Sequence, residues 1–166
     1  MSMQENKAII IMGVSGVGKT TVGKLLAETT GLPFYDGDDY HSAANIAKMA
    51  AGVALTDADR ETWLKQLHEL LQMQLTLKGC ILACSALKKN YRDVLEGNLA
   101  NVSFVYLQGS YKQVLQRLEE RKGHYMKADL LQSQFDILEE PSNALTISIQ
   151  LSVEDIVATI VKQFSL

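Results

Sequence analysis

With 166 residues the chain fits a single domain, and because 47% of its residues are hydrophobic it has ample material for one buried core. The formal net charge of −3 argues against nucleic acid as the main partner, because such binders usually present a net basic face. No stretch approaches the ~20 apolar residues of a membrane span, and the apolar run 8–12 is far too short for a signal peptide. We therefore expect a cytoplasmic protein with no membrane partner.

Short apolar runs alternate with amphipathic stretches along the whole chain. They predict strands at 8–12, 33–35, 80–84, 102–107 and 144–149. Helices are expected at 19–30, at 45–51, from Thr56 through Leu71, through Leu95 to Gly97, at 111–121, from there to about 140, and at 153–164. Strands that alternate with helices imply a parallel sheet covered on both faces. We predict one α/β domain over residues 1–166, with five parallel strands in a three-layer α/β/α arrangement.

The segment that follows the first strand completes the pattern G-x-x-x-x-G-K-[ST]. Its residues, all assigned to ATP binding, are Gly13, Val14, Ser15, Gly16, Val17, Gly18, Lys19 and Thr20. Glycines let such a loop curl so that its backbone N–H groups face a phosphate chain at the positive end of the next helix. Lys19 would reach the β- and γ-phosphates, and the Thr20 hydroxyl would take a Mg²⁺ position. The pattern predicts a P-loop kinase that uses ATP and Mg²⁺.

Three carboxylates, Asp36, Asp38 and Asp39, follow the second strand, which should lie beside the P-loop. Carboxylates there could hold Mg²⁺ or accept the proton of the acceptor hydroxyl. Asp36 and Asp38 point to opposite sides of an extended chain, so they need not share a role. The third strand ends without a carboxylate, which moves the metal duty toward Asp36, and Asp39 is expected to be an ordinary surface residue.

Two sets of cations are candidates for binding an anionic acceptor. Arg60 stands in the opening turn of a helix, where a cation works against the helix dipole and needs another reason to be present. Lys88, Lys89 and Arg92 follow the third strand and so lie at the carboxyl edge of the sheet. The planar fork of arginine suits a carboxylate, and together these residues hint at an acid as acceptor.

A third set of cations, Arg117, Arg121, Lys122 and His124, surrounds a polar break between two helices. Small kinases often close such a segment over ATP, which excludes water and places an arginine on the transferring phosphoryl group. We predict a helical lid over about 117–140, with Arg117 on ATP and Arg121 as the catalytic arginine.

Cys80 and Cys84 are expected on one strand, where four residues separate their Cα atoms by ~13 Å. A disulfide requires less than ~7 Å, so we predict two reduced thiols in the core.

Several groups of residues, which run from the P-loop to Pro141, resemble the gluconate kinase family, relatives of shikimate kinase. They are residues 12–20; Asp36-Gly37-Asp38 with His41, Asn45, Lys48-Met49 and Gly52; Asp57, Asp59-Arg60 and Trp63-Leu64; Cys84-Ser85-Ala86-Leu87-Lys88-Lys89 with Tyr91-Arg92-Asp93; Arg121 with Gly123-His124; and Ser133-Gln134-Phe135 with Leu138-Glu139-Glu140-Pro141. The P-loop alone names only a superfamily, whereas the other groups together are specific.

The resemblance implies the reaction ATP + D-gluconate → ADP + 6-phospho-D-gluconate, with Mg²⁺. By analogy with shikimate kinases, Asp38 would contact the acceptor hydroxyl and Arg60 the substrate carboxylate. The catalytic residues expected are Lys19, Asp38 and Arg121. The expected substrate-binding residues are Asp38, His41, Arg60, Lys88, Arg92 and His124, and the metal-side residues are Thr20 and Asp36. A homodimer is a further expectation from the family.

Two other functions stay open on the residues alone. One is a kinase of the same fold that acts on another small acceptor, such as shikimate or a nucleotide. The other is a regulatory module that binds ATP without transferring its phosphate, for which Asp38 and the lid cations would have no use.

Overall fold

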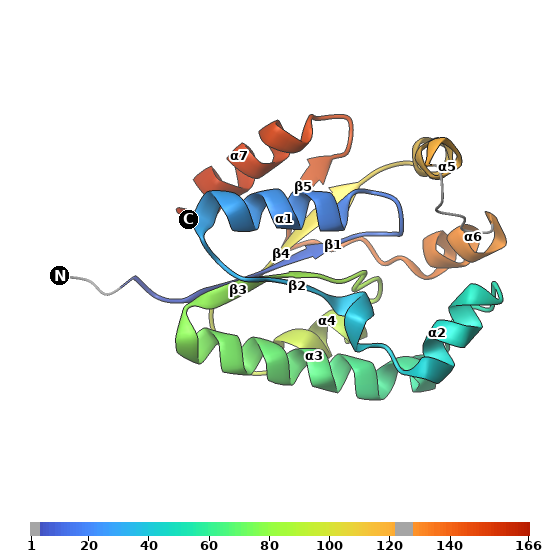
Figure 1. The fold of residues 1–166 in the computed structure, drawn as a ribbon, viewed down its shortest axis with the longest axis horizontal. Coiled ribbons are helices and arrows are strands. Elements are labelled where there is room, and N and C mark those ends of the chain that lie inside the picture. The colour runs from blue at the N-terminus through green and yellow to red at the C-terminus, as the bar shows by residue number, and fades with distance from the viewer. Residues whose placement is uncertain (1–3, 122–127) are drawn as a thin grey trace.

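The computed structural model describes residues 4–121 and 128–166, and at its centre is a five-stranded parallel sheet (Figure 1). The strands are β1 (Lys7–Met12), β2 (Phe34–Asp36), β3 (Gly79–Ala83), β4 (Val102–Gln108) and β5 (Leu145–Ser148). Their order is β2-β3-β1-β4-β5, and every neighbouring pair is parallel. The predicted sheet is confirmed, with strand ends that differ by at most one residue from those expected.

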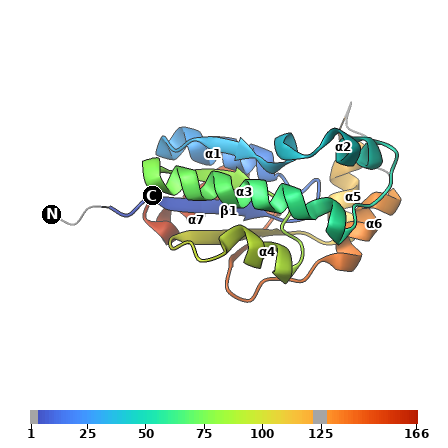
Figure 2. The same cartoon turned by 90° about the horizontal axis from the view of Figure 1, so that it is seen from below.

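Among the described residues, four helices cover the two faces of the sheet, and three others stand at one of its edges. They are α1 (Lys19–Thr30), α2 (Ala43–Ala50), α3 (Asp57–Leu77), α4 (Lys89–Glu96), α5 (Tyr111–Glu120), α6 (Ala128–Ile137) and α7 (Val153–Phe164), with a 3-10 turn at Gly37–Tyr40. The helices α1 and α7 pack together on one face, and α3 and α4 pack together on the other (Figures 1 and 2). The three-layer α/β/α prediction is confirmed.

The strand β1 shows why the core has two layers. Its residues from Ala8 to Met12 are all 0% exposed, as expected for a strand with helices on both faces. Because successive side chains of a strand point to opposite faces, Ile9 and Ile11 join the cluster beneath α1 and α7, whereas Ile10 and Met12 join the cluster beneath α3.

The carboxyl ends of the strands meet at the edge where α2, α5 and α6 stand, at the right of Figure 1. Caps account for two helix boundaries that agree with those expected, the end of α1 and the start of α3. Gly31 ends α1 with a φ of 79°, and Thr56 and Asp59 form a reciprocal capping box at the start of α3.

The helix expected to run to about residue 140 ends earlier, at Ile137, and the polar break at Lys122, Gly123 and His124 lies outside the described residues. Cys80 and Cys84 are free and buried, and burial raises the pKa of each thiol to about 12. The predicted core thiols are confirmed.

In the two described ranges, none of the helices combines the length and the apolar character that a bilayer crossing requires.

Candidate active site

The P-loop joins β1 to α1 and is shaped by glycines with left-handed backbone angles. Gly18 caps α1 with a φ of 98°, and Gly13 has a φ of 143°. A Cβ on Gly13 would stand 2.9 Å from the carbonyl oxygen of Leu107, so a larger residue would push the loop away from β4. The loop therefore turns tightly beside the sheet and leaves the amino end of α1 open to a ligand.

The side chain of Lys19 closes back over this loop. Its Nζ donates to the carbonyl oxygens of Gly13 and Val14, each at 2.9 Å. Burial lowers the pKa of Lys19, and the negative charges of Asp38 and Asp36 partly oppose that effect. A phosphate that binds in the loop would supply the negative charge that a buried ammonium favours.

The side chains of Asp36 and of Thr20, which follows Lys19 in the sequence, form a hydrogen-bonded pair at the same edge of the sheet. The Thr20 hydroxyl donates to Asp36 Oδ2 at 2.9 Å, and Asp36 Oδ1 accepts from the backbone N–H of Asp38 at 3.0 Å. Two adjacent ligands of an octahedral Mg²⁺ also stand about 2.9 Å apart, given metal–oxygen distances of ~2.0–2.1 Å. The pair fits a magnesium ion that completes its shell with phosphate and water oxygens. In the described part of the chain, no group of three or more His, Cys, Asp or Glu side chains could hold a metal by itself.

A cavity of about 780 Å³ opens beyond the carboxyl ends of the strands. It brings together many of the predicted residues from distant parts of the sequence. Among those that line it are Ser15, Gly16, Gly18, Lys19, Thr20, Asp36, Asp38, His41, Arg60 and Arg121. The phosphate side and the acceptor side predicted from sequence thus face one space.

Asp38 stands in the cavity and has no neutralising partner in close contact among the described residues. Its side chain is 84% exposed, so water reaches the carboxylate. The surrounding protein nevertheless removes part of the solvation of this carboxylate, which raises the pKa of Asp38, and the negative charge of Asp36 raises it further. The positive charge of Lys19 lowers it. A carboxylate with a raised pKa is a better proton acceptor than an ordinary one.

His41 lies beside Asp38 and is stacked on Trp63, with ring centroids 4.1 Å apart and planes 17° from parallel. Its Nε2 is 4.0 Å from Asp38 Oδ1. Burial, helped by the charge of Arg60, lowers the pKa of His41 to about 4, so the ring is neutral at pH 7. A neutral imidazole has one donor and one acceptor. Because the Asn45 amide group next to Nδ1 can only donate, Nδ1 accepts and the Nε2–H is the group left for a hydroxyl of a bound molecule.

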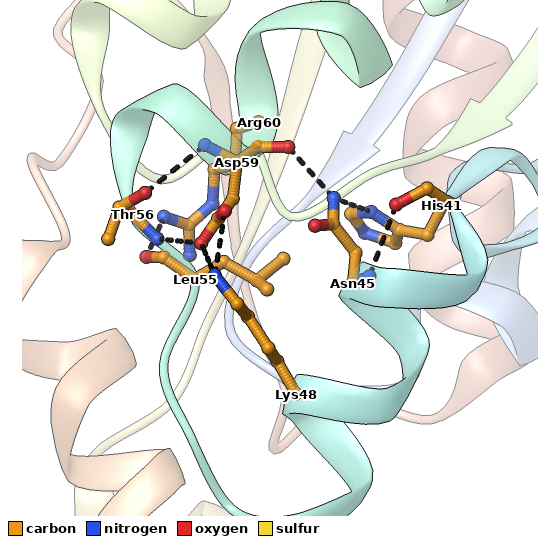
Figure 3. A network of polar contacts seen from close by, with 8 residues as sticks. His41, Asn45, Lys48, Leu55, Thr56, Asp59 and Arg60 are labelled. Atoms are coloured by element: carbon orange, nitrogen blue, oxygen red, sulfur yellow. Dashed lines mark hydrogen bonds and ion pairs between the residues drawn. The ribbon is translucent and has the colours of Figure 1, made fainter.

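The helices α2 and α3 are tied together behind His41 and Arg60, as Figure 3 shows. Asn45 Nδ2 donates to the carbonyl oxygen of Asp59 at 2.8 Å and lies 3.5 Å from His41 Nδ1. The Asp59 carboxylate accepts from Lys48 Nζ at 2.9 Å on both oxygens and from the backbone N–H of Thr56, also at 2.9 Å. The tie fixes the acceptor side of the cavity.

Lys88 and Arg92, predicted to bind the acceptor, do not line this cavity. Arg92 is only 7% exposed, and its guanidinium donates to the carbonyl oxygens of Ala86, Leu87 and Glu139. These bonds use Arg92 to hold the loop after β3, so we assign it a structural role in place of substrate binding. Lys88 Nζ is engaged by the Asp57 carboxylate at 3.1 Å.

The two arginines assigned to the predicted lid lie in different surroundings, although they are one helical turn apart. Arg121 ends α5 and lines the cavity, where its charge acts on Lys19. Arg117 instead donates to the carbonyl oxygens of Val17, at 3.5 Å, and Ile149. His124 lies outside the described residues.

Gln134 on α6 is a site residue to which the sequence analysis assigned no role. Its side chain makes two bonds with Ser15 of the P-loop: Oε1 accepts from the Ser15 N–H at 2.7 Å, and Nε2 donates to the Ser15 hydroxyl at 3.0 Å. The side-chain amide therefore occupies a backbone donor of the kind that P-loops use for phosphate. Only its position within the Ser-Gln-Phe motif could have pointed to it.

The glycine-rich loop opens α1 at the carboxyl edge of a parallel sheet, and one cavity there is lined by Lys19 from this loop and by the exposed carboxylate of Asp38. This arrangement defines the class of the protein as a P-loop kinase. Comparison with known proteins agrees, because residues 15–163 match the family model described as shikimate kinase. Gluconokinase of Arabidopsis thaliana is 43% identical over 94% of this chain and 91% of its own length. The chain belongs to the gluconokinase family.

Two further matches support the assignment at different levels. Thermoresistant gluconokinase of Escherichia coli (strain K12) is 41% identical over 92% of this chain and 90% of its own length. The crystal structure of a gluconokinase from Sinorhizobium meliloti 1021 is 36% identical, covers 98% of this chain and 94% of its own, and superposes with a TM-score of 0.88. Shikimate kinase from Aquifex aeolicus, 20% identical with a TM-score of 0.60, shares the fold.

Proposed function

We propose that this protein transfers the γ-phosphoryl group of ATP to the 6-hydroxyl of D-gluconate, giving ADP and 6-phospho-D-gluconate. The observation that carries the proposal is that Lys19, Asp38, His41 and Arg60 line one and the same cavity. D-Gluconate has a carboxylate at one end and a primary hydroxyl at the other, which matches a cation and a general base in one space.

On the phosphate side, the backbone N–H groups of the P-loop and Lys19 bind the β- and γ-phosphates of ATP. Because Lys19 is fixed before reaction, it stabilises the charge that develops on the transferring group without reorganisation. Thr20 and Asp36 would hold Mg²⁺, which neutralises phosphate charge when bound. Arg121, at the cavity wall, meets the γ-phosphoryl group as it transfers.

On the acceptor side, Asp38 orients the 6-hydroxyl and takes its proton as the new phosphorus–oxygen bond forms. Its raised pKa favours that step. The neutral ring of His41 hydrogen-bonds the polyol chain, and Arg60 binds the carboxylate through a charge-assisted pair.

The proposal extends to the whole protein. Residues 1–166 act as one kinase domain, with the segment at about 117–140, including Arg117 and His124, as its lid over ATP. The enzyme works in the cytoplasm on small molecules, without nucleic acid or membrane as partner, and as a homodimer. Sedimentation of the full chain tests the last point.

A coupled ADP-release assay tests the function against its competitors. The panel contains D-gluconate, other sugar acids, shikimate and nucleoside monophosphates, each with ATP and Mg²⁺. Release of ADP that depends on D-gluconate, with phosphate on the 6-hydroxyl by NMR, is the expected result. A clear preference for shikimate or a nucleotide would mean that the acceptor is that compound and not D-gluconate. ATP binding without transfer to any acceptor would mean that the protein is a regulatory module.

A further inference from the structure

Arg60 is held at one end of its guanidinium and left open at the other. The two hydrogens of Nη1 are both engaged: Nη1 donates to the carbonyl oxygen of Leu55 at 2.6 Å and to the Tyr91 hydroxyl at 3.2 Å. Across residues 4–121 and 128–166, the Nε and Nη2 donors of Arg60 meet no acceptor. This free edge belongs to a side chain that lines the cavity, and it offers the forked pair of donors that a carboxylate accepts.

The Tyr91 hydroxyl that holds Arg60 is itself fixed by two further charged residues. It donates to Asp57 Oδ1, and Lys88 Nζ donates to the same carboxylate at 3.1 and 3.3 Å. The Tyr91 ring also lies near both cations, 5.2 Å from the Arg60 guanidinium carbon and 5.6 Å from Lys88 Nζ. The contacts therefore form one chain from Lys88 through Asp57 and Tyr91 to Arg60.

The direction of this chain follows from the protonation of its members. Tyr91 is 3% exposed, and burial together with the bond to Asp57 raises its pKa to about 12. The bonds from Tyr91 and Lys88 lower the pKa of Asp57, so that carboxylate is charged at pH 7. The phenol has one hydrogen, which goes to Asp57, and its oxygen is then free to accept only from Arg60.

We propose that Tyr91, supported by Asp57 and Lys88, is a positioning residue that turns the free edge of Arg60 toward the carboxylate of the acceptor. It thereby sets the preference of the enzyme for an acid over a neutral polyol. This inference rests on the proposed function. It also gives a role to Lys88, which was predicted to bind the acceptor and pairs instead with Asp57: the lysine acts on the substrate through Asp57, Tyr91 and Arg60.

The test is Tyr91→Phe, which keeps the buried ring and removes only the hydroxyl. We expect KM for D-gluconate to rise about 3- to 10-fold, the range for one lost hydrogen bond, with kcat and KM for ATP within about twofold of wild type. Tyr106→Phe is the matched control: Tyr106 is equally buried at 3% exposed, but its hydroxyl bonds Glu140 at 3.2 Å, which does not line the cavity, whereas that of Tyr91 bonds Arg60, which does. It should leave KM unchanged.

A double-mutant cycle with Arg60→Ala separates positioning from general stability. If Tyr91 acts through Arg60, Tyr91→Phe has no further effect on KM in the Arg60→Ala background. If Tyr91→Phe folds poorly, Asp57→Asn serves as the second variant, because Asp57 is exposed. It should also raise KM for D-gluconate. A normal KM in Tyr91→Phe, or an equal rise with and without Arg60, overturns the inference alone. Absence of wild-type activity with D-gluconate overturns the proposed function and this inference with it.

Discussion

Asp38→Asn is the substitution that most directly tests the chemical step. The primary hydroxyl of a polyol acid is a poor nucleophile at pH 7, and its proton must leave as the phosphorus–oxygen bond forms. Asparagine keeps the size of the side chain and can still orient the hydroxyl, but it cannot accept the proton. The hydrogen bond from the backbone N–H of Asp38 to Asp36 does not involve the replaced group, so Asp36 and its pairing with Thr20 should persist.

The expected loss in kcat is about 10²- to 10⁴-fold, the usual contribution of a positioned general base. This corresponds to about 2.7–5.4 kcal/mol of transition-state stabilisation. The raised pKa of Asp38 argues for the upper part of that range, whereas its 84% exposure in the open site argues for the lower part. Because water screens an exposed carboxylate, we expect a loss nearer to 10²-fold unless the site closes around the substrate.

Steady-state kinetics with D-gluconate and calorimetry with ATP and Mg²⁺ check this expectation together. KM should change little and ATP binding should remain. Asp39→Asn is the matched control, because Asp39 is an exposed neighbour that does not line the active-site cavity. If ATP–Mg²⁺ binding collapses in Asp38→Asn, the residue serves the metal and Asp36 becomes the better candidate for the base. A loss in kcat below about fivefold would refute both roles.

Three other predictions address the phosphate side and the pH dependence. Lys19→Ala should lower kcat by about 10²–10³ with a smaller effect on ATP affinity, and near-normal turnover would contradict the P-loop assignment. Arg121→Ala should lower kcat with little change in either KM, and an effect confined to thermal stability would make it an ordinary helix cation. The folded-state pKa of His41 is depressed from 6.5 to about 4, so the folded state binds fewer protons and stability falls as the pH drops from 6.5 to 4. Denaturant titrations should show that His41 makes the protein up to about 3 kcal/mol less stable at pH 4 than at pH 7. His41→Gln should lack this contribution to the loss of stability.

The sheet and the P-loop could be predicted from the sequence because the patterns that indicate them involve residues close together in the chain. The bounds of α1 follow from Lys19 after the glycine loop and Gly31 at its end, and the capping box of Thr56 and Asp59 marks the start of α3. Signals of this kind need no knowledge of distant contacts. Asp36 and the P-loop that carries Lys19 stand just after the carboxyl ends of predicted strands, and because the carboxyl ends of parallel strands meet at one edge of the sheet, the positions of both residues at that edge could be predicted as well.

The roles of individual cations could not be predicted, because they depend on partners far away in the sequence. Arg92 and Arg60 both follow a strand or open a helix, yet one is saturated by backbone carbonyls and the other presents donors to the cavity. Lys88 meets Asp57, which lies 31 residues earlier, and Gln134 meets Ser15, which lies 119 residues earlier. No spacing rule in a single sequence encodes such pairs.

The two halves of the site differ in how they are built, and this bears on how the acceptor is chosen. The phosphate half rests largely on backbone groups of the P-loop, and the side chains of Lys19 and Gln134 contact that loop. The acceptor half rests on the side chains of Asp38 in the 3-10 turn, His41 just after it and Arg60 on α3. Behind them Asp59 ties α3 to α2: its carboxylate binds Lys48 and the Thr56 N–H, and its carbonyl oxygen binds Asn45. The bond to Lys48, with the backbone bond to Thr56, lowers the pKa of Asp59 to about 2, so this tie stays charged at any pH at which the enzyme works. A change of acceptor therefore requires new side chains around this side of the cavity, including those that hold Arg60, whereas the ATP half can stay as it is.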